Sequence, residues 1–192
     1  MNVEVRTSGG ITLVPIESVL MTNRKIFVVG EINDDMACEF VKQILLLNLN
    51  DSDKPIDILV NSAGGEINSG MLMYDAIQSC KAPVRTFCIG KAYSMAAVLV
   101  ASATGGRYIL PHGEMMIHEP QLKSALGGDS SSIKSAFDSI IETRRNINHI
   151  LSIHTGKSFV EVEEATGYDH FFSAKESVEF GLCDEVISFD KI

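Results

Sequence analysis

The sequence has few features of secreted, membrane-spanning or metal-binding proteins. Its four cysteines form no C-x-x-C pair and no H-E-x-x-H motif occurs, so we expect no metal site. The longest continuous apolar run, residues 95–101, is far too short to cross a bilayer. Polar residues such as Asn2 and Glu4 follow Met1, so no secretory signal peptide is visible. We therefore expect a cytoplasmic protein with reduced thiols and no membrane partner.

Positive charge is scarce as well. The chain has 16 lysines and arginines against 25 acidic residues, which gives a net charge of -9 at pH 7. This balance argues against nucleic acid or an anionic membrane surface as a partner. No phosphate-binding loop is present, so we expect neither bound ATP nor another cofactor. Because no linker or low-complexity segment interrupts the chain, residues 1–192 are predicted to form a single domain.

A strand followed by a helix is predicted three times in the first half of the chain. The strands are residues 25–29, 56–60 and 84–89, and a helical pattern follows each of them. This alternation predicts an α/β fold with a largely parallel sheet covered by helices on both faces. Ligands of such sheets bind at the carboxyl ends of the strands.

Two segments project beyond this pattern. Residues 1–15 contain two short apolar runs around a glycine-rich turn and are predicted to form a hairpin. From Asp129 to Gly156, an amphipathic pattern recurs in steps of three and four, which predicts a helix of about 26 residues that is roughly 39 Å long. That is more apolar helix than a domain of this size needs, so we expect a subunit interface there.

Local signals organise the C-terminal third. Ser158 with Glu161, and Ser173 with Glu176, have the spacing of a capping box, which predicts that a short helix begins at each. Residues 186–189 are predicted as a final strand.

Ser94 is the first candidate for chemistry. It lies between a strand and an apolar helical segment, where free backbone N–H groups and the helix dipole favour an oxyanion. The corner resembles a nucleophile elbow, although Ala92 and Ala96 stand where glycines would be. The alternative is that Ser94 only caps the helix.

A nucleophilic serine needs a base and a group that orients the base. His118 ends an apolar strand and is the favoured base, although a structural histidine would fit the same pattern. Asp169 precedes two phenylalanines that are expected to shield it, and it is the candidate orienting acid. The other histidines are interpreted as surface, interface or turn residues: His112, His149, His154 and His170. Gly64-Gly65 could present backbone N–H groups to a ligand or form only a tight turn.

Motifs spread over residues 16–190 resemble one known family. They are residues 61–65, Gly70, Tyr74-Asp75, residues 92–95, Leu110-Pro111, residues 116–118, residues 154–156, Asp169, Ser173-Ala174 and residues 180–184. Together they are similar to ClpP, the proteolytic subunit of the Clp protease, within the crotonase-like superfamily. The resemblance implies a crotonase/ClpP-like α/β fold of repeated strand–helix units and a serine endopeptidase.

The resemblance also implies a role for each candidate residue. Ser94 would be the nucleophile, His118 the general base and then acid, and Asp169 the orienting carboxylate. The backbone N–H groups of Gly65 and Met95 would form the oxyanion hole.

An extended substrate would bind as an added strand between two edges of the chain. The positions that match these edges are Glu66 and Ile67 on one side and Gln121 and Leu122 on the other.

Assembly follows from the same resemblance. Residues 121–156 match the handle region that stacks two heptameric rings into a tetradecamer with an internal chamber. Residues 1–15 match the axial pore hairpin. An AAA+ unfoldase, which hydrolyses the ATP, would dock on the outer face and feed unfolded polypeptide into the chamber.

Three positions depart from the family pattern. Ala63 replaces a proline, Ala96 replaces a glycine, and Tyr168 stands where an arginine often helps to join the rings. Assembly therefore stays open between a homo-oligomer and a mixed barrel with a ClpP paralogue. Two alternative functions also stay open: a catalytically silent ring subunit, and a crotonase-fold enzyme that acts on acyl-CoA thioesters.

Overall fold

A mostly parallel sheet forms the centre of the structure. The computed structural model describes residues 1–7, 9–121 and 128–192. In this part of the chain the sheet has seven strands, and β3, β4, β5, β6 and β9 lie side by side in that order. Their bounds are β3 Lys25–Val29, β4 Ile56–Ser62, β5 Val84–Tyr93, β6 Gly106–Ile109 and β9 Glu185–Val186. β7 (Glu114–Ile117) pairs in parallel with the far end of β5, and β8 (His170–Ser173) pairs antiparallel with β7. The α/β fold class is confirmed.

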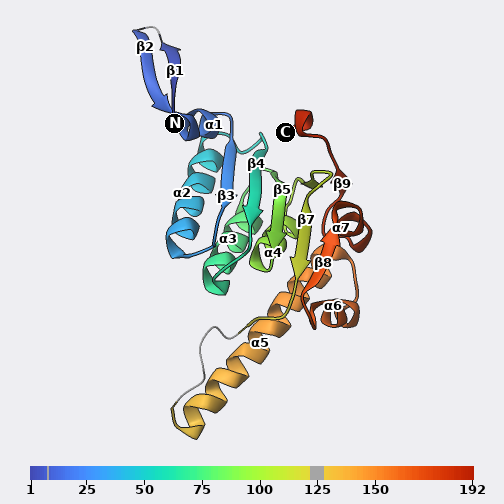
Figure 1. Cartoon of the computed structure of the whole chain (residues 1–192). Coiled ribbons are helices and arrows are strands. Elements are labelled where there is room, and N and C mark those ends of the chain that lie inside the picture. The colour runs from blue at the N-terminus through green and yellow to red at the C-terminus, as the bar shows by residue number, and fades with distance from the viewer. Residues whose placement is uncertain (8, 122–127) are drawn as a thin grey trace.

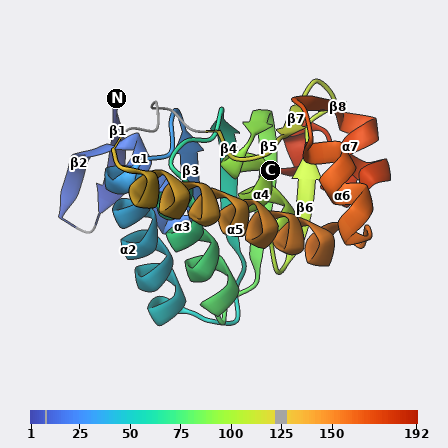
Figure 2. The same cartoon turned by 90° about the horizontal axis from the view of Figure 1, so that it is seen from below.

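Helices pack on this sheet and extend beyond it. They are α1 Ile16–Thr22, α2 Asp34–Asn50, α3 Ile67–Ser79, α4 Met95–Ala101, α5 Ser130–Thr155, α6 Phe159–Thr166 and α7 Ala174–Phe180. A hairpin of β1 (Asn2–Thr7) and β2 (Gly10–Pro15) projects at one end of the molecule, and α5 projects at the opposite end (Figure 1). Seen along the strands, α5 crosses the sheet at the end toward which the strands point (Figure 2). Every residue of α4 is buried, so this helix lies at the centre of the core.

Local sequence rules predicted several elements correctly. α5 begins after Asp129, whose side chain accepts a hydrogen bond from the Ser132 N–H, and ends before Gly156 in the left-handed conformation. Both predicted capping boxes are present, at Ser158 and at Ser173. These ends depend on neighbours within one helical turn, which is why the sequence alone was sufficient.

Other expectations were wrong. β5 continues to Tyr93 instead of ending near residue 89, because its last residues pair with β7 after the pairing with β6 has ended. The final strand stops at Val186, and a short 3-10 helix occupies Phe189–Lys191. Helices do not cover both faces of β3: Val28 is 1% exposed, whereas its neighbour Val29 is 51% exposed. One face of this edge strand is therefore bare and apolar.

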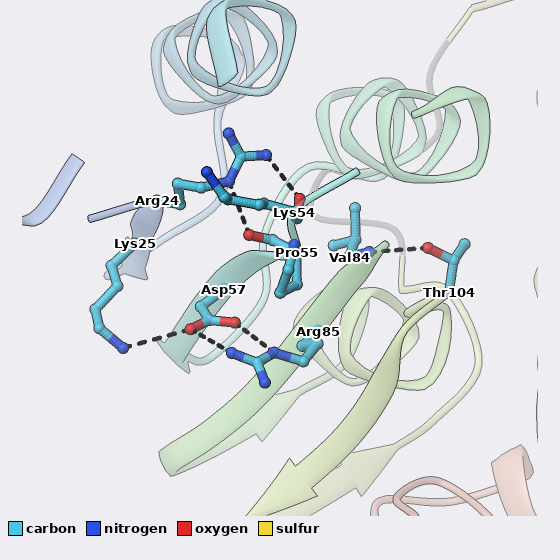
Figure 3. Close-up of polar contacts among 8 residues, drawn as sticks. All are labelled: Arg24, Lys25, Lys54, Pro55, Asp57, Val84, Arg85 and Thr104. Atoms are coloured by element: carbon cyan, nitrogen blue, oxygen red, sulfur yellow. Dashed lines mark hydrogen bonds and ion pairs between the residues drawn. The ribbon is translucent and has the colours of Figure 1, made fainter. Parts of the chain in front are cut away.

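A polar cluster lies at the amino-terminal ends of β3, β4 and β5, opposite the Ser94 corner (Figure 3). The Asp57 carboxylate, whose side chain is 9% exposed, lies 2.7 Å from Arg85 Nε and 3.4 Å from Lys25 Nζ. Arg24 donates hydrogen bonds to four backbone carbonyls of the α2–β4 region, including that of Pro55 at 2.9 Å. These contacts fix the starts of β3, β4 and β5 against one another and join the loop after α1 to the α2–β4 region.

Candidate active site

Ser94 lies at a strained corner between β5 and α4. Its φ of 54° and ψ of -124° are unfavourable for a residue with a side chain, and such strain is typical of functional sites. The Ser94 N–H donates to the Met116 carbonyl at 2.8 Å, which fastens the corner to β7. Its side chain forms no capping hydrogen bond, so the alternative that Ser94 only caps the helix is wrong. The hydroxyl is turned toward a histidine instead.

Strand pairing brings His118 to Ser94. Tyr93 on β5 pairs with Met116 on β7, so the residues that follow these two strands emerge side by side. His118 Nε2 lies 2.9 Å from Ser94 Oγ. The predicted proximity of these two side chains is thus present in the structure.

Asp169 reaches the other ring nitrogen of the histidine. In the antiparallel pair of β7 and β8, Ile117 faces His170, so the register places Asp169 opposite His118. Asp169 Oδ1 lies 2.8 Å from His118 Nδ1. The N–H of Glu119 also donates to the Thr166 carbonyl at 2.7 Å, which ties together the two loops that carry His118 and Asp169.

The hydrogen positions in this chain of contacts follow from chemistry. An ionised carboxylate can only accept, so His118 Nδ1 carries the hydrogen and Nε2 is free to accept the Ser94 hydroxyl proton. Gln121 Nε2 also lies 3.3 Å from Nδ1. Because both groups are then donors, this contact is not a hydrogen bond in that tautomer.

Asp169 is less shielded than expected. Its side chain is 54% exposed, whereas that of His118 is 15% exposed. Of the two following aromatic residues, Phe172 is buried but Phe171 is 50% exposed, so only one of them contributes to the core. The prediction of a shielded carboxylate was wrong.

The remaining histidines are not close to Ser94 in any contact that the structure describes. His112 and His149 are exposed, as expected. His154, interpreted as a surface or interface residue, is half-buried and its Nε2 lies 3.2 Å from the Tyr74 hydroxyl. Burial, and then the positive charge of Arg107, lower the pKa of His154.

The Gly64-Gly65 turn lies directly against the Ser94 corner. A Cβ on Gly64, which has a φ of 86°, would lie 2.6 Å from the Tyr93 carbonyl oxygen and 2.9 Å from Ser94 Cβ. A Cβ on Gly65 would lie 2.0 Å from the Ile32 carbonyl oxygen. Glycine is therefore required here by close contact as well as by backbone conformation.

Two backbone N–H groups are free at this corner. Within the described residues, neither the Gly65 N–H nor the Met95 N–H donates a hydrogen bond. For Met95 the reason is general, since the first N–H groups of a helix have no intrahelical acceptor. The turn that carries Gly65 is held by Ser62, whose hydroxyl accepts from the Gly64 N–H at 3.0 Å and donates to the Gly30 carbonyl at 2.5 Å.

A groove of about 1140 Å³ passes Ser94 and His118. Three of the four predicted substrate-binding residues line it: Glu66, Ile67 and Gln121. The fourth, Leu122, lies outside the described residues. A smaller apolar pocket opens beside Ser94, and its walls come from α3, α4, α5, the last residue of β7 and the loop that follows it: Ile67, Met95, Val98, Ile117, Pro120, Ile147 and Leu151.

Tyr93 and Glu114 are site residues that the sequence analysis did not identify. The Tyr93 hydroxyl donates to the Glu114 carboxylate, and this hydrogen bond is the main cause that raises the pKa of Tyr93 to about 12. Tyr93 therefore stays a neutral donor and adds a side-chain link between β5 and β7 directly before Ser94. No local pattern marks this pair, because the two residues are brought together only by strand pairing.

Nearly the whole chain matches one known family of proteins. The sequence model of the family described as Clp protease matches residues 8–190 of the chain. The chain belongs to the Clp protease family. Members of this family are serine peptidases, so the chain is a ClpP-type peptidase, as the resemblance implied. The match covers the segments that carry Ser94, His118 and Asp169.

The three residues that depart from the family pattern lie near the site or in the core below it. Ala63 is exposed in the groove wall, next to the glycine turn. Ala96 is fully buried in the first turn of α4. Tyr168 is 61% exposed and lies directly before Asp169. None of them interrupts the contacts of Ser94 with His118.

Among the described residues, no helix combines the length and apolar character needed to cross a membrane.

Proposed function

We propose that the chain is a serine endopeptidase whose nucleophile is Ser94, activated by His118 and Asp169. The observation that carries this proposal is the continuous set of contacts from Ser94 Oγ through the imidazole to the Asp169 carboxylate, at 2.9 Å and 2.8 Å. Both distances are within hydrogen-bonding range, which general-base catalysis requires.

The reaction follows from these positions. His118 Nε2 removes the proton from the Ser94 hydroxyl as the oxygen attacks the scissile carbonyl, and Asp169 stabilises the resulting imidazolium. The N–H groups of Gly65 and Met95 are free to donate to the oxyanion. His118 then gives its proton to the leaving amine, and water hydrolyses the acyl-enzyme by the reverse roles. No cofactor enters these steps, so we expect none to be needed.

The groove suggests how the substrate is held. We expect an extended polypeptide to lie between the Glu66-Ile67 edge and Gln121, with backbone hydrogen bonds as in β-augmentation. The apolar pocket beside Ser94 has a volume of about 20 Å³, room for about one water molecule, so its walls would have to move apart to take the side chain next to the scissile bond. Since Ile147 and Leu151 of α5 form part of its wall, the pocket favours an apolar side chain.

Two separate apolar surfaces support assembly into stacked rings. On α5, Phe137 and Ile141 are 56% and 45% exposed, and on α2, Leu46 and Leu49 are 49% and 82% exposed. A ring needs a repeated lateral contact, and a stacked pair of rings needs a second, self-complementary contact. We propose that α2 and the bare face of β3 form the lateral contact within a ring and that α5 forms the contact between two rings. The stacked rings would then enclose the site in a chamber.

The chain would then depend on a partner for folded substrates. We propose that an AAA+ unfoldase uses ATP to feed unfolded polypeptide into the chamber, and that the hairpin of β1 and β2 lies at the entry. A cytoplasmic location is part of the same proposal. A barrel mixed with a paralogue is the alternative assembly, and sedimentation of the purified chain alone distinguishes the two.

The test of the proposed activity compares the wild type with Ser94→Ala and with Ser18→Ala, a serine that is exposed on α1. Hydrolysis of a fluorogenic peptide and of unfolded casein is measured with purified protein. We expect Ser94→Ala to lose at least about 1000-fold in kcat and Ser18→Ala to keep wild-type activity. Persistent hydrolysis by Ser94→Ala would show that another nucleophile acts, and a wild type without any activity would support the silent-subunit alternative.

A further inference from the structure

Three aromatic side chains form a continuous stack beside Asp169. The Tyr168 ring lies on the His170 ring, with centroids 5.1 Å apart, and His170 lies on Phe172 at 4.2 Å; the planes of each pair are 16° apart. Phe172 is 3% exposed and also contacts Phe180 at 4.9 Å, which anchors the stack in the core. The stack thus connects an exposed ring to the interior of the protein.

Asp169 lies between Tyr168 and His170 in the sequence but is not part of the stack. Tyr168 and Asp169 precede β8, which begins at His170. The rings of Tyr168 and His170 stack on each other, whereas the Asp169 carboxylate between them in sequence contacts His118. The stack therefore joins the residue before Asp169 to the residue after it.

The Asp169 carboxylate has little other support. It is 54% exposed, and within the described residues its only side-chain hydrogen bond is the one to His118. It also lies at a change of structure, since α6 ends at Thr166 and β8 begins at His170. Residues 167–169 span this change, so the direction of the carboxylate depends on what fixes the backbone on each side of it.

We propose that Tyr168 is a positioning residue for the reaction: by stacking on His170 it fixes the backbone around Asp169 and so holds the carboxylate against His118 Nδ1. This inference rests on the proposed function, because it assumes that Asp169 orients His118 during catalysis. Tyr168 does not line the groove, so at equal assembly its contribution reaches the reaction through Asp169.

This role predicts a specific kinetic signature. Removing the ring by Tyr168→Ala frees the backbone before Asp169, and we expect kcat to fall about threefold to tenfold, the range that corresponds to the loss of one aromatic stacking contact. KM should stay within about twofold of the wild type, because the groove is unchanged. Tyr168→Phe keeps the stacked ring and removes only the hydroxyl, so it should restore kcat.

The experiment compares these two variants with the wild type and with Phe189→Ala, which removes another exposed aromatic ring, 69% exposed, on the C-terminal 3-10 helix. Peptide hydrolysis is measured at concentrations at which sedimentation shows equal assembly for all four proteins, and thermal unfolding is recorded for each. A fall in kcat for Tyr168→Ala alone, with rescue by phenylalanine, supports the proposal.

Other outcomes would overturn it. A wild-type kcat for Tyr168→Ala, an equal loss in Tyr168→Phe, or a loss that disappears once assembly is matched would each show that the stack does not position Asp169. A fluorophosphonate that fails to label Ser94 in the wild type would instead refute the proposed function itself. The two failures are therefore distinguishable.

Discussion

Replacing Asp169 with asparagine removes the negative charge that faces the imidazole and leaves a side chain of nearly the same size. An amide can also donate a hydrogen to His118 Nδ1, which favours the tautomer whose Nε2 is already protonated and cannot accept from Ser94. Asp169→Asn therefore removes a charge and weakens the control of the tautomer, with little change in packing.

The expected loss follows from the exposure of the site. Two unit charges about 4 Å apart attract by roughly 1 kcal/mol in water and by roughly 4 kcal/mol at an effective dielectric of about 20. Because Asp169 is 54% exposed and His118 only 15%, the interaction lies between these limits. This range corresponds to a fall in kcat of roughly 5-fold to 1000-fold, less than the roughly 10,000-fold typical of a buried triad aspartate.

The assay is hydrolysis of a fluorogenic peptide by wild type, Asp169→Asn and the control Asp53→Asn, which removes an exposed carboxylate from the loop before β4. We expect kcat to fall in Asp169→Asn while KM stays near the wild-type value, and Asp53→Asn to behave as the wild type. Equal kcat in all three proteins would refute the reasoning, because the contact with His118 would then have no part in the reaction.

Three further predictions concern the Ser94 corner, the polar cluster around Asp57 and the α5 helix. Gly64→Ala places a Cβ 2.9 Å from Ser94 Cβ, so we expect kcat to fall at least about tenfold. Sedimentation should show unchanged assembly. A wild-type kcat would show that the turn can move away from Ser94. Asp57→Asn should lower the free energy of unfolding, measured by urea denaturation, by about 1–3 kcal/mol. The loss is smaller than for a fully buried ion pair because the partner Arg85 is partly exposed. An unchanged midpoint of urea unfolding would mean that the cluster adds no stability. The pKa of His154 is lowered below 6.5 in the folded state, so the unfolded state binds protons better. The contribution of His154 to the free energy of unfolding should therefore fall as pH drops below about 6.5 and stay level above it. His154→Gln should flatten this acid limb of the melting temperature, and an equally steep limb in the variant would assign the dependence to other groups.

The sequence predicted the parts of the fold that depend on near neighbours. Asp129, Ser158 and Ser173 each cap a helix within three residues, so their role is visible in the pattern alone. α1 and β8 were not predicted, because the first is short and has no buried residue and the second depends on pairing with a strand more than 50 residues away. Secondary structure that depends on distant partners carries a weak local signal.

The same distinction applies to the site. A serine before a helix can cap it or attack a substrate, and both roles occupy the same position in the sequence; only the orientation of Ser94 toward His118 separates them. The pairing of Tyr93 with Glu114, and the exposure of Asp169, depend on how β5, β7 and β8 meet. These features required the three-dimensional structure.

The most direct test of the central claim is the rate at which a fluorophosphonate modifies Ser94, followed by intact mass, in the wild type and in His118→Ala. The account predicts a single adduct on Ser94 in the wild type and a rate at least about 100-fold lower in the variant, since the hydroxyl then has no base within reach. Equal rates in the two proteins would contradict it, because Ser94 would then be reactive without the imidazole that lies 2.9 Å away.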